Sequence, residues 1–422
     1  MTSRWIWLSS QIIHRIWFRA SLFSLLAIAT ALVAIFVRPY IPSNWTTSIG
    51  ADAVDNVLSI IASSMLTVTT FSLSTMVSAY SAATSSVTPR ATRLIMQDST
   101  TQNVLATFVG SFLFSLVGII ALSTGAYGES GRVVLFVVTI AVIVLIIVTL
   151  LRWIDHLSSL GRVTETTARV EVVTIEAMRS RRKRPFLGCR PLNDASFDVP
   201  ATARPIFPSA IGYVQHLDTG GLSAIATAGG GQIFVRTIPG QLTGTNEPVA
   251  WSVGLRDHDL DQDAIRSCFS IGQTRSFDQD PRFGACVLAE IASRALSPAV
   301  NDPGTAIDVI TRAIRVLSVW AEPVDPALEA EILYPNVHVP PIDLAGLFDD
   351  LFVPIARDGA GIIEVGLQLQ KALRVLSLYD DDRFRQNARR HSVEALGRAE
   401  LQLAFAGDRE RIRRASEAVR RT

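Results

Sequence analysis

The strongest pattern along the chain is a stripe of hydroxyl-bearing residues inside a long uncharged segment. No charged residue occurs between Asn56 and Pro89. Within this segment, hydroxyl residues recur at steps of three or four: Ser63, Thr67, Thr70, Ser74, Ser78, Ser81 and Ser85. Such steps place side chains on one face of an α-helix. At about 1.5 Å per residue the segment reaches roughly 50 Å, so the predicted helix is longer than the roughly 30 Å of a bilayer core. We expect Pro89 to break or kink it.

The stripe permits two interpretations. Small and hydroxyl-bearing residues let membrane helices pack closely, with each hydroxyl bonded to a carbonyl of its own or a neighbouring helix. Alternatively, the same face lines water, and several subunits that each contribute one such helix enclose a pore. Charges at the two predicted mouths are Asp52 and Asp55 at one end and Arg90 and Arg93 at the other. The carboxylates favour cations and the guanidiniums favour anions, so the pattern assigns no selectivity.

Other apolar segments predict further membrane helices. With the hydroxyl helix, the predicted spans are about 20–38, 54–82, 103–124 and 132–152. Residues 1–19 interleave Trp and Ile with Arg and resemble an interfacial helix. A cleaved signal peptide is the rival interpretation of the first span, but the 19-residue lead and the absence of a convincing small-x-small cleavage site favour an uncleaved span. Small residues give the third span a close-packing face: Gly110, Ser111, Ser115 and Gly118. The fourth span is uniformly apolar, as a lipid-facing helix would be.

The distribution of arginine predicts the topology. Most arginines near the spans lie on one side, which the positive-inside rule makes cytoplasmic. These are Arg4, Arg15, Arg19, Arg90, Arg93, Arg152 and Arg162. The opposite loops hold Arg38 and Arg132. We therefore expect both termini in the cytoplasm.

The remainder of the chain predicts a soluble α+β region. The fourth span is expected to continue as a helical stalk over 153–184, in which Val163, Val170 and Ala177 repeat at seven. This repeat fits either an amphipathic connector or a short self-associating stalk. The stalk ends in the basic run 179–184, which favours acidic lipid over nucleic acid because no base-reading module accompanies it. The segments that follow are a Pro-rich linker at 185–209, a small β-rich module at 210–258 and an α-helical domain at 259–422. The module is expected to hold strands at 211–217, 232–238 and 248–253.

Three predicted helix starts share an Asp-Pro pair. They are Asp280-Pro281, Asp302-Pro303 and Asp325-Pro326. Aspartate at the N-cap accepts from free backbone N–H groups, and proline is tolerated at the first helical position. The first two of these helices are expected at 281–296 and 303–321, and later ones at 343–357, 360–379, 381–406 and 408–420.

Composition adds a membrane character and excludes several chemistries. Apolar residues make up 49% of the chain, its net charge is +1 and its mean hydropathy is +0.32, which is too apolar for an ordinary soluble enzyme. Cys189, Cys268 and Cys286 form no CxxC pair and fit a reducing compartment. The acidic cluster at 257–263 lacks the Gly and Glu that a calcium loop needs, so it predicts a helix start. No metal, cofactor or catalytic motif is recognised, and we expect no enzyme.

One polar constellation stands out in the soluble region. Its members are Arg275, Asp278, Gln279, Asp280, Arg294, Asn301 and Asp302. The simpler interpretation is a helix pair with capped ends that are cross-linked by Arg–Asp bonds. The functional alternative is a small anionic or polar ligand held by Arg275 and Arg294 between two helix N-termini.

The segment that contains this constellation carries a family resemblance. RSFDQDPRFGACVLAEIASRALSPAVNDPGTAIDVI, at 275–310, resembles a bacterial predicted-membrane-protein family labelled domain of unknown function 2254. Residues 85–98 and 212–218 also match its pattern, although members tend to have Gln-Phe-Ser-Pro-Arg where this chain has Ser-Val-Thr-Pro-Arg at 86–90. The resemblance implies a bacterial inner-membrane protein with a cytosolic C-terminal region. It brings no activity and no functional residues.

These observations lead to two functional hypotheses. The first is a homo-oligomeric ion channel or pore lined by the Ser63–Ser85 stripe. The second is a membrane-anchored sensor or scaffold whose cytosolic region binds a small ligand or a protein partner. In both, the expected partners are membrane lipid and other copies of the chain, an ion or ligand of unknown identity, and no nucleic acid.

Overall fold

The computed structural model divides the chain into two compact units, which adjoin at Glu165 and Thr166. It describes residues 51–96, 98–124, 128–159, 161–192, 202–255, 258–322 and 331–422, with Pro200 and a few positions between 21 and 33. The interfacial helix expected at 1–19 and most of the span expected at 20–38 lie outside these residues.

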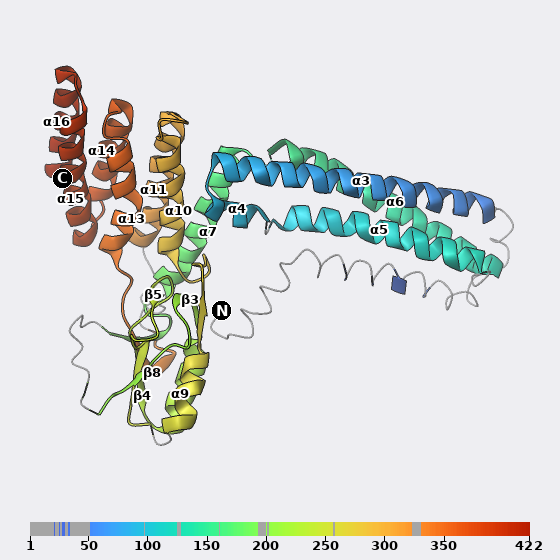
Figure 1. Cartoon of the computed structure of the whole chain (residues 1–422), viewed down its shortest axis with the longest axis horizontal. Coiled ribbons are helices and arrows are strands. Elements are labelled where there is room, and N and C mark those ends of the chain that lie inside the picture. Colours follow the sequence, from blue (N-terminus) through green and yellow to red (C-terminus); the bar gives the residue numbers. More distant parts are fainter. Residues whose placement is uncertain are drawn as a thin grey trace. The chain divides into compact units, whose positions relative to one another are not determined.

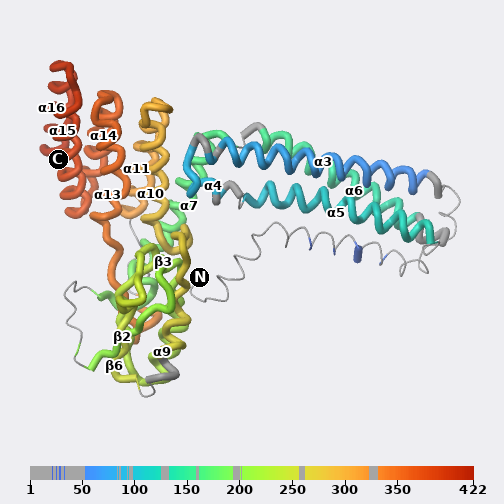
Figure 2. Tube along the Cα trace, viewed as in Figure 1, coloured from blue at the N-terminus to red at the C-terminus, as the bar shows by residue number. Residues whose placement is uncertain are grey.

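The first unit is a bundle of long helices. Its elements are α3 (Ala51–Ser86), α4 (Pro89–Met96), α5 (Ser99–Ser123) and α6 (Gly128–Ser159). Helices α3, α5 and α6 run side by side (Figure 1; Figure 2). Among the described residues, three stretches are long and apolar enough to cross a membrane, namely Ala53–Ala82, Ser99–Ser123 and Val133–Leu157. They coincide with three of the four expected spans.

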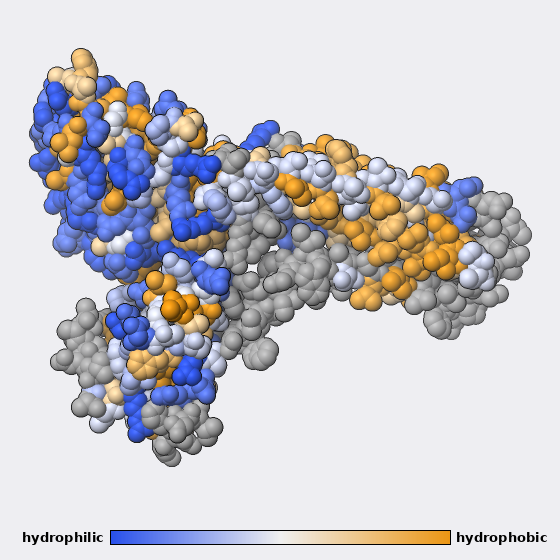
Figure 3. Space-filling model, in the orientation of Figure 1, coloured by the Kyte–Doolittle hydropathy of each residue, from blue (hydrophilic) through white to orange (hydrophobic). Residues whose placement is uncertain are grey.

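Small residues bring the bundle helices together. Gly110, Ser111, Ser115 and Gly118 are all buried, which confirms the close-packing face of α5. A Cβ at residue 118 would lie 3.0 Å from the side chain of Leu58 on α3. On α6, by contrast, many large apolar side chains are exposed, and Figure 3 shows apolar residues gathered over the bundle. This is the surface that a lipid-facing helix requires.

Two breaks define the ends of these helices. Helix α3 ends at Ser86 and α4 begins at Pro89, as the sequence predicts. The expectation that the fourth span continues unbroken through residue 180 is wrong, because α6 ends at Ser159 and α7 (Val163–Lys183) begins after Gly161. Gly161 has φ +82°, and a Cβ there would lie 3.2 Å from the carbonyl oxygen of Ala79. A left-handed glycine in close contact with a neighbouring backbone explains the interruption.

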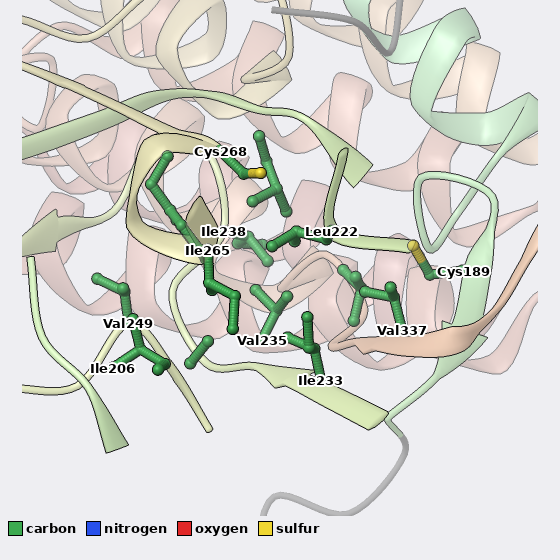
Figure 4. Packing of buried hydrophobic residues seen from close by; sticks show 14 of the residues in the cluster. Cys189, Ile206, Leu222, Ile233, Val235, Ile238, Val249, Ile265, Cys268 and Val337 are labelled. Atoms are coloured by element: carbon green, nitrogen blue, oxygen red, sulfur yellow. The ribbon is translucent and has the colours of Figure 1, made fainter. Parts of the chain in front are cut away.

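The second unit contains two sheets. Its strands are β1 (Cys189–Pro191), β2 (Arg204–Ile206), β3 (Gly212–Leu217), β4 (Gln232–Val235), β5 (Leu242–Thr243), β6 (Ala250–Val253), β7 (Phe269–Gly272) and β8 (Tyr334–Val339). The strand orders are β1-β8-β4-β6-β2 and β5-β3-β7. Strand β8 pairs in parallel with β1 and β4, and the other pairs are antiparallel. Helices α8 (Thr219–Gly229) and α9 (His258–Ser267) add Leu222 and Ile265 to the core that these strands bury (Figure 4).

The sheets correct the predicted domain plan. The segment 185–209, expected to be a linker, contributes β1 and β2, and the region expected to be helical contributes β7 and β8. The β-rich module at 210–258 is therefore not self-contained. Strands β1 and β2 lie at the two edges of the larger sheet, where Pro191 and Pro205 are tolerated because an edge strand can lack a ladder donor. Helix α9 begins within the acidic cluster, which agrees with the predicted helix start.

The C-terminal half stacks helices side by side (Figure 1). They are α10 (Pro281–Ala295), α11 (Pro303–Ala321), α13 (Leu344–Asp358), α14 (Ile363–Ser377), α15 (Asp382–Gln402) and α16 (Ala406–Arg420). The Asp280 and Asp302 carboxylates accept from the N–H groups of Phe283 and Thr305, and a proline follows each aspartate. Both predicted Asp-Pro helix starts are thus confirmed. The third, at 325–326, lies outside the described residues.

Helix α7 packs into this second unit. Val170, Thr174 and Ala177 are buried, and a Cβ at Gly284 of α10 would overlap Thr174. The sevenfold repeat, interpreted as either a connector or a self-associating stalk, is therefore explained by packing within the chain. Val170 and Ala177, which a self-associating stalk would present to a second copy, are already covered.

Candidate functional site

The hydroxyl stripe of α3 faces away from its own bundle. Six of its seven side chains are exposed, those of Ser63, Thr67, Thr70, Ser74, Ser78 and Ser81. The backbone of Ser85 lies in α3, but its side chain is not among those described. Neither α5 nor α6 covers the stripe. Packing against another described helix of the same chain, one of the two interpretations, therefore does not explain it.

The opposite face of α3 makes the bundle contacts. Its buried side chains include Val54, Leu58, Ile61, Met65, Ser72 and Met76. At 3.6 residues per turn this buried face is centred about half a turn from the stripe. The described hydroxyl positions therefore point outward from Ser63 to Ser81.

Large apolar side chains border the stripe on both sides. Ile60 and Phe71 lie along one border, and Leu66, Leu73 and Val77 lie along the other. All five are exposed. The outward surface of α3 is thus a narrow polar line between two apolar margins.

The hydroxyls differ in their hydrogen bonding. Ser63 donates to the carbonyl oxygen of Ser59, Thr67 to that of Ser63 and Thr70 to that of Leu66, at 2.9–3.0 Å. Such bonds to the preceding turn satisfy a hydroxyl in an apolar environment. The side-chain hydroxyls of Ser74 and Ser78 make no hydrogen bond with any residue in the described part of the chain. Their hydroxyls have the capacity to bond to water or to an ion.

The predicted mouth charges lie at opposite ends of α3. Asp55 is exposed near the start of the helix, and Arg90 is exposed at the start of α4. Asp52 and Arg93 belong to the same two helices, but their side chains are not described. Since α3 has 36 residues, its ends are about 54 Å apart.

A polar cluster between α5 and α6 was missed by the sequence analysis. Asp98 lies 2.9 Å from His156 Nε2 and accepts from both the N–H and the hydroxyl of Thr101 at 2.8 Å. The side chains of Asp98 and His156 are 9% and 11% exposed. Ionisable residues at the end of a membrane helix are costly without partners. The available signal was an aspartate just before one span and a histidine in the last turn of another.

The cytosolic constellation separates into two groups. At the N-terminus of α10, Arg275 donates to both oxygens of Asp280, at 2.7 and 2.9 Å. Gln279 accepts from the N–H of Leu217 at 2.9 Å, and Asp278 accepts from the hydroxyl of Ser276. Burial alone would lower the pKa of Arg275, but the Asp280 carboxylate raises it above its ordinary value.

The other members lie at the far end of α10. Arg294 is in its last turn, and Asn301 and Asp302 precede α11. The 15 residues of α10 separate the groups by about 22 Å. The ligand expected between two helix N-termini, held jointly by Arg275 and Arg294, is therefore wrong in its geometry. Capping and Arg–Asp cross-linking, the simpler interpretation, is confirmed at the α10 start.

The basic run 179–184 is partly structural. Arg182 donates to the carbonyl oxygen of Trp320 at 2.9 Å, and Arg181 is only 3% exposed. Arg179, Lys183 and Arg184 remain exposed. The run was expected to contact acidic lipid, and its exposed members are accessible for that contact.

Comparison with known proteins places these features in a family. The family model described as predicted membrane protein, domain of unknown function 2254, matches residues 13–375. The chain belongs to this family. Uncharacterised proteins of Mycobacterium bovis and Mycobacterium tuberculosis are each 27% identical to it over 274 residues, which cover 63% of this chain and 52% of the relative. The chain thus spans about half the length of the curated relatives it matches. No solved structure matches it.

The domain-2254 match covers the main features of both units. It includes the hydroxyl stripe, the Asp98–His156 cluster and the start of α10, whereas α15 and α16 lie beyond it. The segment 275–310, on which the resemblance rests, forms α10 with its preceding loop and the start of α11. The domain-2254 family is described as a predicted membrane protein, which agrees with the apolar helices.

Proposed function

We propose that this protein is a homo-oligomeric ion pore of the bacterial inner membrane, lined by α3. The observation that carries the proposal is the outward direction of the hydroxyl stripe. A stripe exposed on the outside of one bundle would become the inner wall if several copies arranged their α3 helices around a common axis. The apolar margins, Ile60 and Phe71 on one side and Leu66, Leu73 and Val77 on the other, would then meet the neighbouring subunits.

The chemistry of the stripe suits conduction. Hydroxyl oxygens replace part of the hydration shell of an ion without binding it as tightly as carboxylates would. Ser74 and Ser78 lie near the middle of the apolar segment, and their side-chain hydroxyls make no hydrogen bond with the described residues. Binding of moderate strength at several sites allows an ion both to enter and to leave.

The topology of the proposal has four spans and two cytoplasmic termini. The first span is the apolar segment 20–38, and the other three are the long helices of the bundle. The arginine distribution supports this orientation. In this proposal the second unit lies in the cytosol, where it would hold the subunits together or control opening. The proposal assigns no enzymatic reaction to the protein.

The test is ion flux from liposomes that contain the purified full-length protein, with potassium and chloride gradients measured separately. Ser74→Trp and Ser78→Trp should block flux, because an indole would fill a narrow pore at these positions. Val144→Trp on the exposed face of α6 is the matched control and should leave flux unchanged. Undiminished flux through an intact oligomer of both serine variants would refute the pore.

A membrane-anchored sensor or scaffold is the second candidate. In that case the spans only anchor the protein, and its cytosolic unit binds a ligand or partner. The observation that favours it is the arrangement of charges at the start of α10. A folded protein that shows no flux of either ion would favour this candidate.

A further inference from the structure

A buried guanidinium without a hydrogen bond lies beside the start of α10. Arg181 of α7 is 3% exposed, and its Nε, Nη1 and Nη2 atoms are all buried. None of the three donates to any residue that the structure describes. A buried charge is strongly disfavoured unless it is paired and hydrogen-bonded. The arrangement around Arg181 is therefore incomplete.

Helix geometry directs Arg181 toward Asp280. Thr174, Met178 and Arg181 share the buried face of α7, and Thr174 touches α10 at Gly284. Gly284 is one turn from the N-cap Asp280. Asp280 is the carboxylate that acts electrostatically on Arg181, whose pKa burial lowers to about 10. The Asp280 carboxylate thus acts on the Arg181 guanidinium through charge alone, without a hydrogen bond between them.

Asp280 is unavailable because Arg275 already holds it. Both of its oxygens accept from Arg275, and one also accepts from the N–H of Phe283. The next cation, Arg282, has its own partners in Asp350 at 2.7 Å and Asp343 at 3.2 Å. The group of Arg181, Arg275 and Asp280 thus contains two positive charges and one negative charge. It lacks one anion.

The two arginines differ in their access to solvent. The side chain of Arg275 is 20% exposed, whereas the guanidinium of Arg181 is enclosed. An anion that arrives from solvent therefore meets Arg275 first. A tetrahedral oxyanion accepts the paired N–H groups of a guanidinium as a carboxylate does.

We propose that a small oxyanion of the phosphate class binds Arg275 at the start of α10 and that Asp280 then passes from Arg275 to Arg181. After this exchange every charge has a partner: the oxyanion with Arg275, and Asp280 with Arg181. The exchange also tightens the hold on α7, the helix that follows α6 in the chain. The oxyanion is thus a regulatory ligand of the cytosolic unit, and the proposal goes beyond the pore.

The test is thermal unfolding of the full-length protein in detergent, with orthophosphate and pyrophosphate titrated against chloride at matched ionic strength. The wild type should show a saturable rise in Tm with at least one oxyanion. Arg275→Gln should abolish the rise. If that variant does not fold, Arg275→Lys should require at least about tenfold more oxyanion for half the effect, because lysine cannot bond in a bidentate manner.

Arg181→Met provides the decisive comparison. It should lose the oxyanion response while its Tm without oxyanion equals or exceeds that of the wild type, because an unpaired buried charge has been removed. Arg179→Met, an exposed position on the same helix, is the matched control and should keep the full response. A lower Tm for Arg181→Met with an unchanged response would show a purely structural arginine and overturn the proposal. So would a wild type that no oxyanion stabilises, or equal shifts in all variants. The readout does not depend on flux, so its failure and that of the pore are distinguishable.

Discussion

The buried ion cluster between α7 and α11 yields a stability prediction of defined size. Glu171 accepts from Arg312 Nη1 at 2.6 Å and from Arg315 Nη2 at 2.9 Å. Glu171 is 7% exposed and Arg312 is 8% exposed, so both charges have left water. Asp308 also binds Arg312, at 2.7 Å. The perturbation is Glu171→Gln, which keeps the shape of the side chain and removes its charge.

The magnitude follows from the partners that remain. Removing one member of a buried pair costs roughly 3–5 kcal/mol when the other charge is left uncompensated. Asp308 continues to compensate Arg312, and Arg315 is half exposed, so the expected loss is about 2–3 kcal/mol. At about 2–4 °C per kcal/mol for a unit of this size, the Tm of the second unit should fall by about 4–12 °C.

The pH dependence has a defined sign. Burial acts to raise the pKa of Glu171, but the bonds from Arg315 and Arg312 outweigh it, so that the pKa lies below its ordinary value of 4.5. A carboxylate with a depressed pKa contributes stability above the pKa of the unfolded chain and loses it as the pH falls through the folded pKa. The difference between wild type and Glu171→Gln should therefore be full at neutral pH, begin to shrink as the pH falls below 4.5, and disappear once the pH is below the lowered folded pKa.

The assay is scanning fluorimetry of the full-length protein in detergent. Glu176→Gln is the matched control, because Glu176 is exposed on the same helix. The double replacement of Glu171 and Arg312 by Leu should be more stable than Glu171→Leu alone, since it removes a buried guanidinium that would keep only the half-exposed Asp308 as its partner. If Glu171→Gln unfolds at the same temperature as Glu176→Gln, the cluster does not stabilise α7 and the reasoning fails.

Three further outcomes follow from buried positions. Gly118→Val should lower the Tm more than Gly118→Ala, because even a Cβ would lie 3.0 Å from Leu58, and equal Tm values would contradict this packing. Burial lowers the pKa of His391 to about 4, whereas the ordinary value for histidine is 6.5. The free energy of unfolding should therefore decline as the pH falls from 6.5 toward 4, and His391→Gln should flatten that decline in a series of Tm values against pH. Burial raises the pKa of Cys189 to about 12 and that of Cys286 to about 11. The buried Cys189 thiol should resist a disulfide reagent at about pH 8 until the protein is unfolded, and the half-buried Cys286 thiol should react slowly. Rapid labelling of Cys189 in the folded protein would refute its enclosure.

Helices were predictable from the sequence because their determinants are local. The Asp-Pro pairs located the starts of α10 and α11, and the uncharged run at 56–89 located α3 and the break between α3 and α4 before Pro89. Hydroxyl spacing placed the stripe on one face. Its outward direction depended on which face α5 covers, and the sequence of α3 alone does not contain that information.

Strands escaped prediction where their partners are remote. Cys189–Pro191 pairs with Tyr334–Val339, about 145 residues away, and Arg204–Ile206 pairs with Ala250–Val253. Each is a three-residue strand in proline-rich sequence, too short for a period of two to appear. The interruption at Gly161 was missed for a different reason. A lone glycine between two helical patterns is compatible with a continuous helix, and the close approach of Ala79 decides against it.

The burial of Arg181 was suggested by its position on the helix and not by the basic run to which it belongs. As one member of the basic run 179–184, it predicts solvent or lipid contact. The sevenfold repeat of the same helix leads to the opposite expectation, because residue 181 is one turn beyond Ala177 and two turns beyond Thr174 on the face that packs. The structure follows the phase: Arg181 is buried, while Arg179 and Lys183 are exposed. An arginine that its helix places in the core needs a negative partner from another part of the chain. Asp280 lies nearly 100 residues later, at the start of α10, and it is already bound to Arg275. Competition between two arginines for one carboxylate is therefore a property of the assembled fold, which is why the site for an oxyanion emerges only when the three residues are brought together.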